Sequence, residues 1–182
     1  MSRKYKFHSP ESIYFISFAT VYWIDVFIRN KYKWVMLDSW KYCQKEKGLD
    51  IYAWIIMSNH IHMIIGSRKN KLENIVRDMK SFTSHKLRES ISNNKKESRR
   101  EWMLKMMKHA GTINSNNKGF QFWQQHNKPI ELYDNKIMDQ KLDYLHNNPV
   151  VQGIVDEPED YRFSSARDYA GMKGLIDIEF IQ

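Results

Sequence analysis

Two histidines, His60 and His62, are separated by one apolar residue inside a largely apolar run, Trp54–Gly66. Successive side chains of a strand point to opposite faces, so the two imidazoles share one face and Ile61 takes the other. Neighbouring imidazoles on a rigid strand supply two of the ligands that a metal site needs. Two histidines packed inside a hydrophobic strand explain the pattern equally well, so the motif by itself leaves both interpretations open.

A second pair of residues with chemical potential, Tyr144 and Asn148, lies near the end of a predicted helix. Residues four apart share one helical face, so the phenol and the amide point the same way. Pro149 disfavours helical backbone at Asn148 and puts this residue at the helix end, where the negative pole of the dipole favours a cation. A core tyrosine followed by a generic helix stop is the competing explanation.

The composition predicts one globular domain with a basic surface, residues 1–182. Apolar residues make up 42% of the chain and aromatic residues 14%, which suffices for a substantial core. Lysine and arginine number 29 against 21 aspartates and glutamates, giving a net charge of +8. This excess favours a polyanionic partner such as nucleic acid or an anionic membrane surface, although a merely basic protein has the same balance.

Two observations bear on the cysteine chemistry and the cellular location of the protein. Cys43 is the single cysteine, so neither an intramolecular disulfide nor a cysteine-based zinc site is expected. The polar N-terminus lacks the apolar stretch of a signal peptide, and no apolar run approaches the roughly 20 residues that span a bilayer. We therefore expect a cytoplasmic protein without a membrane partner.

The first half of the chain predicts the order strand, helix, strand, strand. Apolar periodicity indicates a helix that ends at Gly48, and Ser58-Asn59 offers a tight turn between two strands. This order is the beginning of a ferredoxin-like arrangement. The predicted elements are a strand at 13–21, a helix at 31–47, and strands at 51–57 and 60–67.

The second half predicts further helices and one or two short strands that extend the sheet. Pro149 is expected to stop the last helix. The predicted elements are helices at 71–91, 101–108 and 136–147, and short strands within 120–132, broken near Pro129. The remaining regions are a loose basic arm at 1–12, a flexible insertion at 92–119 and a C-terminal extension at 150–182.

Together these motifs resemble the single-tyrosine HUH transposases, most closely the branch of REP-associated tyrosine transposases. The resemblance covers most of residues 13–170. It implies an α+β fold, the HUH endonuclease fold: a ferredoxin-like or RRM-like antiparallel sheet with helices packed on one face and the histidines on the opposite, open face. The segments that carry it are Trp54–Ile65, Tyr144–Val150 with Gly153, Tyr161–Arg167, Phe122–Gln124 and Lys80–Thr83.

The resemblance also implies a role for each residue of the two motifs. His60, His62 and Asn148 are expected to bind a divalent metal ion, Mg²⁺ or Mn²⁺, and Tyr144 is expected to be the nucleophile. The implied activity is that of a transposase and nickase that cleaves and rejoins single-stranded DNA at hairpin or repeat sequences, through a 5′-phosphotyrosine intermediate. Members of the family act as monomers or homodimers, so the tyrosine is expected in cis or in trans.

Further candidates for DNA contact lie outside these motifs. Arg77, Lys80 and Lys86 belong to the predicted helix 71–91, whose polar side carries mainly positive charge, and are candidate phosphate contacts. Trp123 and Gln124 are candidates for contact with unpaired bases, because aromatic rings stack on bases of single strands. Solvated surface charges and core packing are the corresponding alternatives.

Two other functions compete with DNA cleavage. One is a non-catalytic module of the same fold that binds single-stranded DNA or RNA. Such a module would not need His60, His62, Tyr144 and Asn148 together. A metal-dependent hydrolase of small phosphoesters would need more carboxylates or histidines than this chain offers near the motif. We assign no chemistry to the Tyr161–Tyr169 motif.

Overall fold

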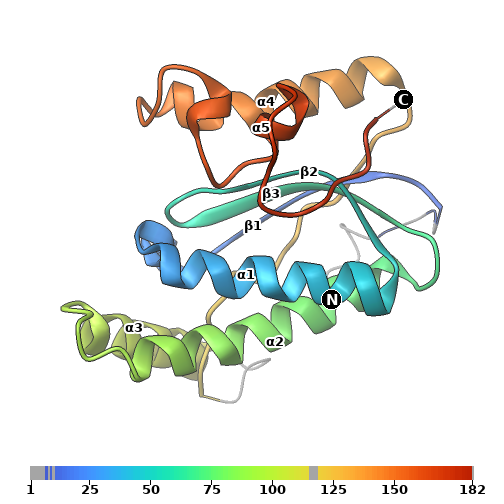
Figure 1. Ribbon diagram of the computed structural model, residues 1–182. Helices are drawn as coiled ribbons and strands as arrows, with labels where there is room; N and C mark the ends of the chain where they lie inside the picture. The colour runs from blue at the N-terminus through green and yellow to red at the C-terminus, as the bar shows by residue number, and fades with distance from the viewer. Residues whose placement is uncertain (1–6, 8, 10, 115–118, 182) are drawn as a thin grey trace.

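A four-stranded antiparallel sheet forms the centre of the protein in the computed structural model, which describes residues 7, 9, 11–114 and 119–181 (Figure 1). The strand order is β2-β3-β1-β4. The strands are β1 (Tyr14–Ala19), β2 (Leu49–Ile56), β3 (His60–Ser67) and β4 (Ile130–Glu131). This sheet, together with its helices, confirms the predicted α+β antiparallel fold class.

The β2–β3 hairpin forms as the sequence predicts. The amide of Met57 donates to the carbonyl of His60 at 2.9 Å and closes the turn over Ser58-Asn59. β3 pairs with β1 on its other side, so it lies inside the sheet. Ile61, Met63 and Ile65 of β3 are fully buried, as expected for the core side of a period-two strand.

Two long helices cover one face of the sheet (Figure 1). Helix α1 (Asn30–Tyr42) continues into one π-helical turn (Cys43–Lys47), and α2 (Leu72–Ser92) packs beside it. Gly48 ends the first helix with φ +70°, a left-handed conformation that glycine adopts without steric cost. Short 3-10 turns occupy Val21–Trp23 and Val26–Ile28 between β1 and α1.

The histidine face, predicted to be open, is partly covered by a second helical layer. Helix α4 (Asn135–Val151) and the short α5 (Ala166–Tyr169) lie on this side of the sheet (Figure 1). Pro149 does not stop α4, contrary to the prediction. Because it stands in the last turn, its missing amide removes only one hydrogen bond; the helix runs to Val151, and Gly153 follows with φ +67°.

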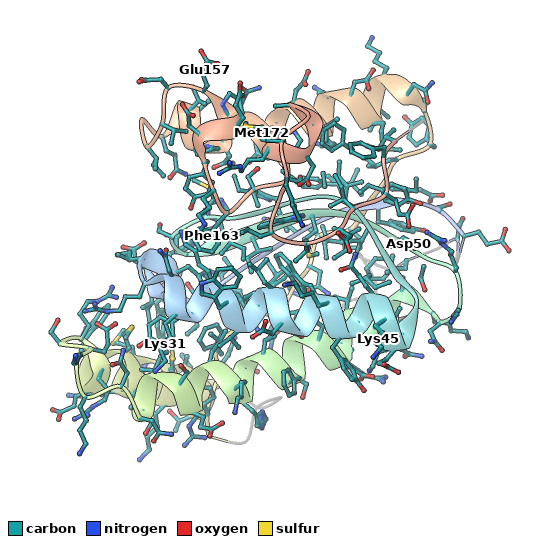
Figure 2. All side chains as sticks on the ribbon, viewed as in Figure 1. Lys31, Lys45, Asp50, Glu157, Phe163 and Met172 are labelled. Atoms are coloured by element: carbon teal, nitrogen blue, oxygen red, sulfur yellow. The ribbon has the colours of Figure 1, made fainter. Side chains whose placement is uncertain are left out.

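The Tyr161–Tyr169 motif completes the outer edge of β2. Ile56 donates its amide to the carbonyl of Phe163, and Ser165 donates its amide to the carbonyl of Trp54. The hydroxyl of Tyr161 donates to the carbonyl of Ile56 at 2.8 Å. Phe163 lies close to one end of the sheet (Figure 2), and the 3-10 turn Pro158–Asp160 precedes it. The motif satisfies edge-strand groups that would otherwise be open to another chain.

The described part of residues 92–119, the predicted flexible insertion, includes a helix and the ion pairs of a buried glutamate. It contains α3 (Arg100–Ile113), longer than the expected helix at 101–108. Glu97 is 3% exposed and forms ion pairs with Arg29 and Arg99 at 2.5 Å and 3.2 Å. The segment is polar because its charges pair with one another and with the start of α1. Most of the predicted arm at 1–12, and residues 115–118, lie outside the described residues.

The predicted strands within 120–132 are confirmed as two short contacts with β1. Trp123 forms an isolated antiparallel bridge with Thr20, and β4 pairs with the opposite end of β1 at Tyr14 and Phe15. Within the part of the chain that the structure describes, no helix is both long and apolar enough to cross a membrane.

Candidate nuclease site

His60 and His62 lie on the sheet face that α4 crosses, and small side chains of β1 flank them. The register places Ser17 opposite His62 and Ala19 opposite His60. A serine and an alanine occupy little space above a sheet, so the imidazoles have room on the β1 side. The predicted shared face of the two histidines is therefore present, and it is accessible to groups from α4.

Four aromatic rings meet at this face and belong to one chain. The ring centroids of His60 and His62 are 4.8 Å apart, and the Tyr144 ring lies 5.3 Å from that of His62. Phe15 stacks on His62 at 5.3 Å with an interplanar angle of 24°. His62 is 5% exposed and Tyr144 is 51% exposed. A buried imidazole thus lies beside a phenol that solvent and a large substrate can reach.

Neither nitrogen of the buried His62 ring has a hydrogen-bond partner among the residues that the structure describes. Such a group normally costs free energy, so an unsatisfied buried imidazole signals a missing partner. Burial, followed by the charges of His60 and Lys141, lowers the pKa of His62 to about 3. The ring is therefore neutral at physiological pH and offers a lone pair, which is the form that binds a metal ion.

Asn59 orients His60, the other histidine of the motif. A hydrogen bond of 2.8 Å joins His60 Nδ1 to Asn59 Oδ1, so Nδ1 carries the proton and Nε2 keeps its lone pair. The Asn59 amide nitrogen donates in turn to the carbonyl of Trp23 at 3.3 Å. Burial lowers the pKa of His60 as well. Both histidines are thus neutral and keep a lone pair, although neither sits in a cluster of three or more His, Cys, Asp or Glu among the residues described.

Asn148 supplies an amide on the same helical face as Tyr144. It is 9% exposed, and its Oδ1 accepts a hydrogen bond from Gln152 Nε2 at 3.3 Å. No hydrogen bond connects it to His60 or His62 in the described chain. Two imidazoles and one amide oxygen would make a neutral ligand set suited to a divalent cation, because such a set leaves the ion's charge and several positions for a phosphate.

His146 fixes the helix that carries Tyr144 to the edge of the sheet. Its Nε2 is hydrogen-bonded to Ser165 Oγ at 2.9 Å, and the Trp54 amide donates to the same oxygen at 2.9 Å. The His146 ring also packs edge-on against Tyr169 at 5.1 Å. The Tyr161–Tyr169 motif therefore connects β2 to α4 and helps to set the position of the phenol over the sheet.

His146 makes stability depend on pH. Burial lowers its pKa in the folded protein to about 4, against 6.5 ordinarily, so between these values the unfolded chain binds more protons. Stability is then complete above pH 6.5 and is lost as the pH falls towards 4, by about 3 kcal/mol from this residue. Between pH 7 and pH 4.5, the free energy of unfolding measured by urea titration should fall less in His146→Gln than in the wild-type protein. Equal losses in both proteins would contradict the prediction, and exposed His85→Gln is the control.

Of two predicted DNA contacts, Trp123 is buried and Lys80 is partly buried. Lys80 Nζ donates to the carbonyl of Gln124 at 3.1 Å and to Asn127 Oδ1 at 2.7 Å, and burial lowers its pKa to about 7. Trp123 is 6% exposed, donates to Thr83 Oγ1 and packs on aromatic core residues. Both side chains are engaged within the fold because the segment around Trp123 folds back along β1 and over the lysine, an arrangement that favours a structural role for each.

The other three predicted DNA contacts also lie away from Tyr144. The Gln124 amide donates to the carbonyl of Thr20 at 3.1 Å and supports the turn after β1. Arg77 and Lys86 are exposed on α2, where Asp78 and Glu89 pair with them. Because α2 and α4 cover opposite faces of the sheet (Figure 1), these cations are not brought together with the tyrosine.

We expect Lys80→Met to destabilise the fold without weakening DNA binding. The substitution leaves the Gln124 carbonyl and Asn127 Oδ1 without their donor, at a cost of about 1–3 kcal/mol. Lys86→Met removes only an exposed pair and should cost less than about 0.5 kcal/mol. Urea unfolding and DNA titration measure the two effects. Weaker DNA binding by Lys80→Met at unchanged stability would restore the phosphate-contact role.

Two residues at this face were not predicted from the sequence. Lys141 Nζ lies 5.3 Å from the Phe15 ring centroid and 5.8 Å from that of Tyr144. Its spacing of three residues before Tyr144 is the signal, since such residues share a helical face. Trp23 lies edge-on to His60 at 6.0 Å and is exposed. No local pattern indicates its position, which depends on the turn after β1.

One solved structure agrees with this architecture. A solved REP-associated tyrosine transposase bound to a REP hairpin matches 100% of this chain and 96% of its own, with a TM-score of 0.65 at 17% identity, a likeness that shows the fold. A candidate transposase structure from Deinococcus radiodurans R1 matches 80% of this chain and 97% of its own, with a TM-score of 0.46 at 13% identity. No curated protein matches the sequence.

A family model provides the assignment that the fold alone does not. The model described as "Transposase IS200 like" matches residues 11–118, which include both histidines and more than half of the sequence. The motifs at His60-Ile61-His62 and Tyr144 point to the same group. The chain therefore belongs to the IS200-like transposase family, the single-tyrosine HUH transposases.

Proposed function

We propose that this transposase cuts and rejoins single-stranded DNA through a covalent 5′-phosphotyrosine on Tyr144. The observation that carries the proposal is the position of the Tyr144 ring, 5.3 Å from a buried His62 whose two nitrogens lack partners. An exposed phenol next to an unsatisfied imidazole suits a reaction in which a phosphate enters between them. A tyrosine in the core would instead be buried and packed.

In the proposed reaction, the Tyr144 hydroxyl oxygen attacks phosphorus and loses its proton to solvent. The new bond joins phosphorus to the phenol, and the bond to the 3′-oxygen breaks, which frees a 3′-hydroxyl. A divalent cation, Mg²⁺ or Mn²⁺, supplies charge that polarises the scissile phosphate when bound. His60, His62 and Asn148 would hold it. A later 3′-hydroxyl reverses the step, and no external energy source is needed because the phosphodiester count is conserved.

The proposed substrate is single-stranded DNA next to a hairpin. The net charge of +8 favours a polyanion, and the solved transposase of similar fold is bound to a REP hairpin. Lys141 lies beside the phenol, where a cation would attract the phosphate entering the site. Because the histidines and the tyrosine meet within one chain, we propose that the tyrosine acts in cis.

Covalent adduct formation tests the proposed function. The protein is mixed with Mg²⁺ or Mn²⁺ and hairpin oligonucleotides with single-stranded tails of random sequence, labelled at either the 5′ or the 3′ end. A 5′-phosphotyrosine predicts that only 3′-labelled DNA stays on the protein in a denaturing gel, while 5′-labelled DNA gives a shorter free fragment. Binding without any adduct would instead support a non-catalytic module of the same fold, and release of both fragments would indicate hydrolysis by water.

A further inference from the structure

The turn after β1 holds two adjacent aromatic residues in an unfavourable backbone conformation. Tyr22 and Trp23 have φ values of +54° and +56°. Residues other than glycine rarely adopt this left-handed region, and two in succession are rarer. The turn is held by Thr20, whose hydroxyl donates to the carbonyl of Ile24 at 2.8 Å. Strain of this kind persists where the surrounding structure enforces it, and it concentrates at functional sites.

The strained turn sends its two rings in different directions. The Tyr22 hydroxyl is hydrogen-bonded to His109 Nδ1 at 3.0 Å, so its ring is tied to α3. The Trp23 ring is 57% exposed and lies edge-on to His60 at 6.0 Å. The hydrogen bond from Asn59 to the Trp23 carbonyl fixes the backbone of this residue to the same amide that orients His60. An exposed indole is thus positioned relative to the histidines.

We propose that Trp23 stacks on an unpaired base next to the phosphate that His60 and His62 receive. This inference rests on the proposed function and assigns a nucleobase-binding position to it. Trp23, His60, His62 and Tyr144 form a row of rings, with the indole at one end and the nucleophile at the other. The Trp23 and His60 ring centroids are 6.0 Å apart, less than two base rises of about 3.4 Å each. A base stacked on Trp23 would therefore belong to a nucleotide adjacent to the phosphate at the histidines.

Two aromatic residues of the segment that pairs with Thr20 are buried. Phe122 and Trp123 are 1% and 6% exposed, so neither ring has a face free for a base. The apolar ring of an exposed tryptophan interacts weakly with water, whereas every base presents a π-face on which an indole can stack, whatever the sequence. Trp23 therefore provides a stacking surface of the kind that the sequence suggested at Trp123 and Gln124.

Fluorescence of 2-aminopurine tests this position directly. The base is placed at successive positions of a hairpin tail, selected from a random-tail pool for binding to the Tyr144→Phe protein, in which the DNA stays intact. Stacking predicts quenching at one tail position. Trp23→Gly and Trp23→Ala should abolish it and weaken binding about 5- to 100-fold. Glycine adopts φ +56° without strain, so loss of binding in that variant cannot come from the turn.

Two controls separate stacking from other effects. Trp23→Phe keeps an aromatic face and should retain most of the quenching, and Trp102→Ala removes a tryptophan of similar exposure, 52%, on α3 without effect. Unchanged quenching and affinity in Trp23→Gly would overturn the stacking role, as would a loss in Trp23→Phe as large as in Trp23→Gly. If the wild-type protein forms the covalent adduct but the Trp23 variants contradict stacking, only the stacking role is refuted and the proposed function stands. If quenching behaves as expected but the wild-type protein forms no adduct, only the proposed function is refuted.

Discussion

A Tyr144→Phe protein is expected to bind hairpin DNA normally and to form no covalent adduct. Removing the hydroxyl removes the atom that would bond to phosphorus, and loss of a nucleophile typically costs about 10³-fold or more in rate. The side chain is 51% exposed, so the fold should keep its stability. A denaturing gel with 3′-labelled oligonucleotide measures the adduct, and a filter or gel-shift titration measures binding.

Tyr133→Phe is the matched control for this substitution. Tyr133 is 77% exposed and lies just before α4, so it is more accessible to DNA than Tyr144 but is not in ring contact with His62. The Tyr133→Phe protein should form the adduct at the wild-type rate. Adduct formation by Tyr144→Phe would mean that another residue is the nucleophile. A parallel loss of DNA binding would mean that the phenol contributes to binding rather than to chemistry alone.

Replacing His62 with leucine is expected to abolish metal-dependent cleavage and to stabilise the metal-free protein. The substitution removes a proposed ligand, which should lower Mn²⁺ affinity by more than about 10-fold. It also removes two buried nitrogens without partners, whose burial costs about 1–3 kcal/mol. Leucine fits the apolar contact with Phe15, so the melting temperature in EDTA should rise.

The opposite signs of these two effects make the test specific. A packed structural histidine predicts a lower melting temperature for His62→Leu, and retained cleavage would refute its role in binding metal. His85→Ala removes an exposed histidine from α2 and should change neither quantity. Mn²⁺ titration monitored by electron paramagnetic resonance gives the affinity without relying on activity, and chelation of the wild-type protein should stop cleavage while DNA remains bound.

The sequence predicted most of the sheet because the local patterns there are strong. Alternation around His60 and His62 places both imidazoles on one face, and the structure agrees. The four-residue spacing of Tyr144 and Asn148 was predictable for the same reason, since it depends only on helical geometry. The end of α4 was predicted wrongly because a proline in the last turn costs too little to stop the helix.

The residues around the site were harder to predict because their environment is set by distant segments. Lys80 and Trp123 have the composition of a DNA surface, but their burial depends on how residues 120–132 fold back over α2 and β1. Trp23 has no motif of its own. Its position follows from a strained turn and from the Asn59 amide 36 residues later, contacts that no local periodicity encodes.

Mapping the covalent adduct identifies the nucleophile. Wild-type protein is reacted with a 3′-tailed hairpin and Mn²⁺, digested with nuclease and trypsin, and analysed by tandem mass spectrometry. We expect a nucleotide on Tyr144, within the tryptic peptide 142–162 that also contains the buried Tyr161 as an internal comparison. A nucleotide on Tyr133 or any other residue, or an adduct of equal yield from Tyr144→Phe protein, would contradict it.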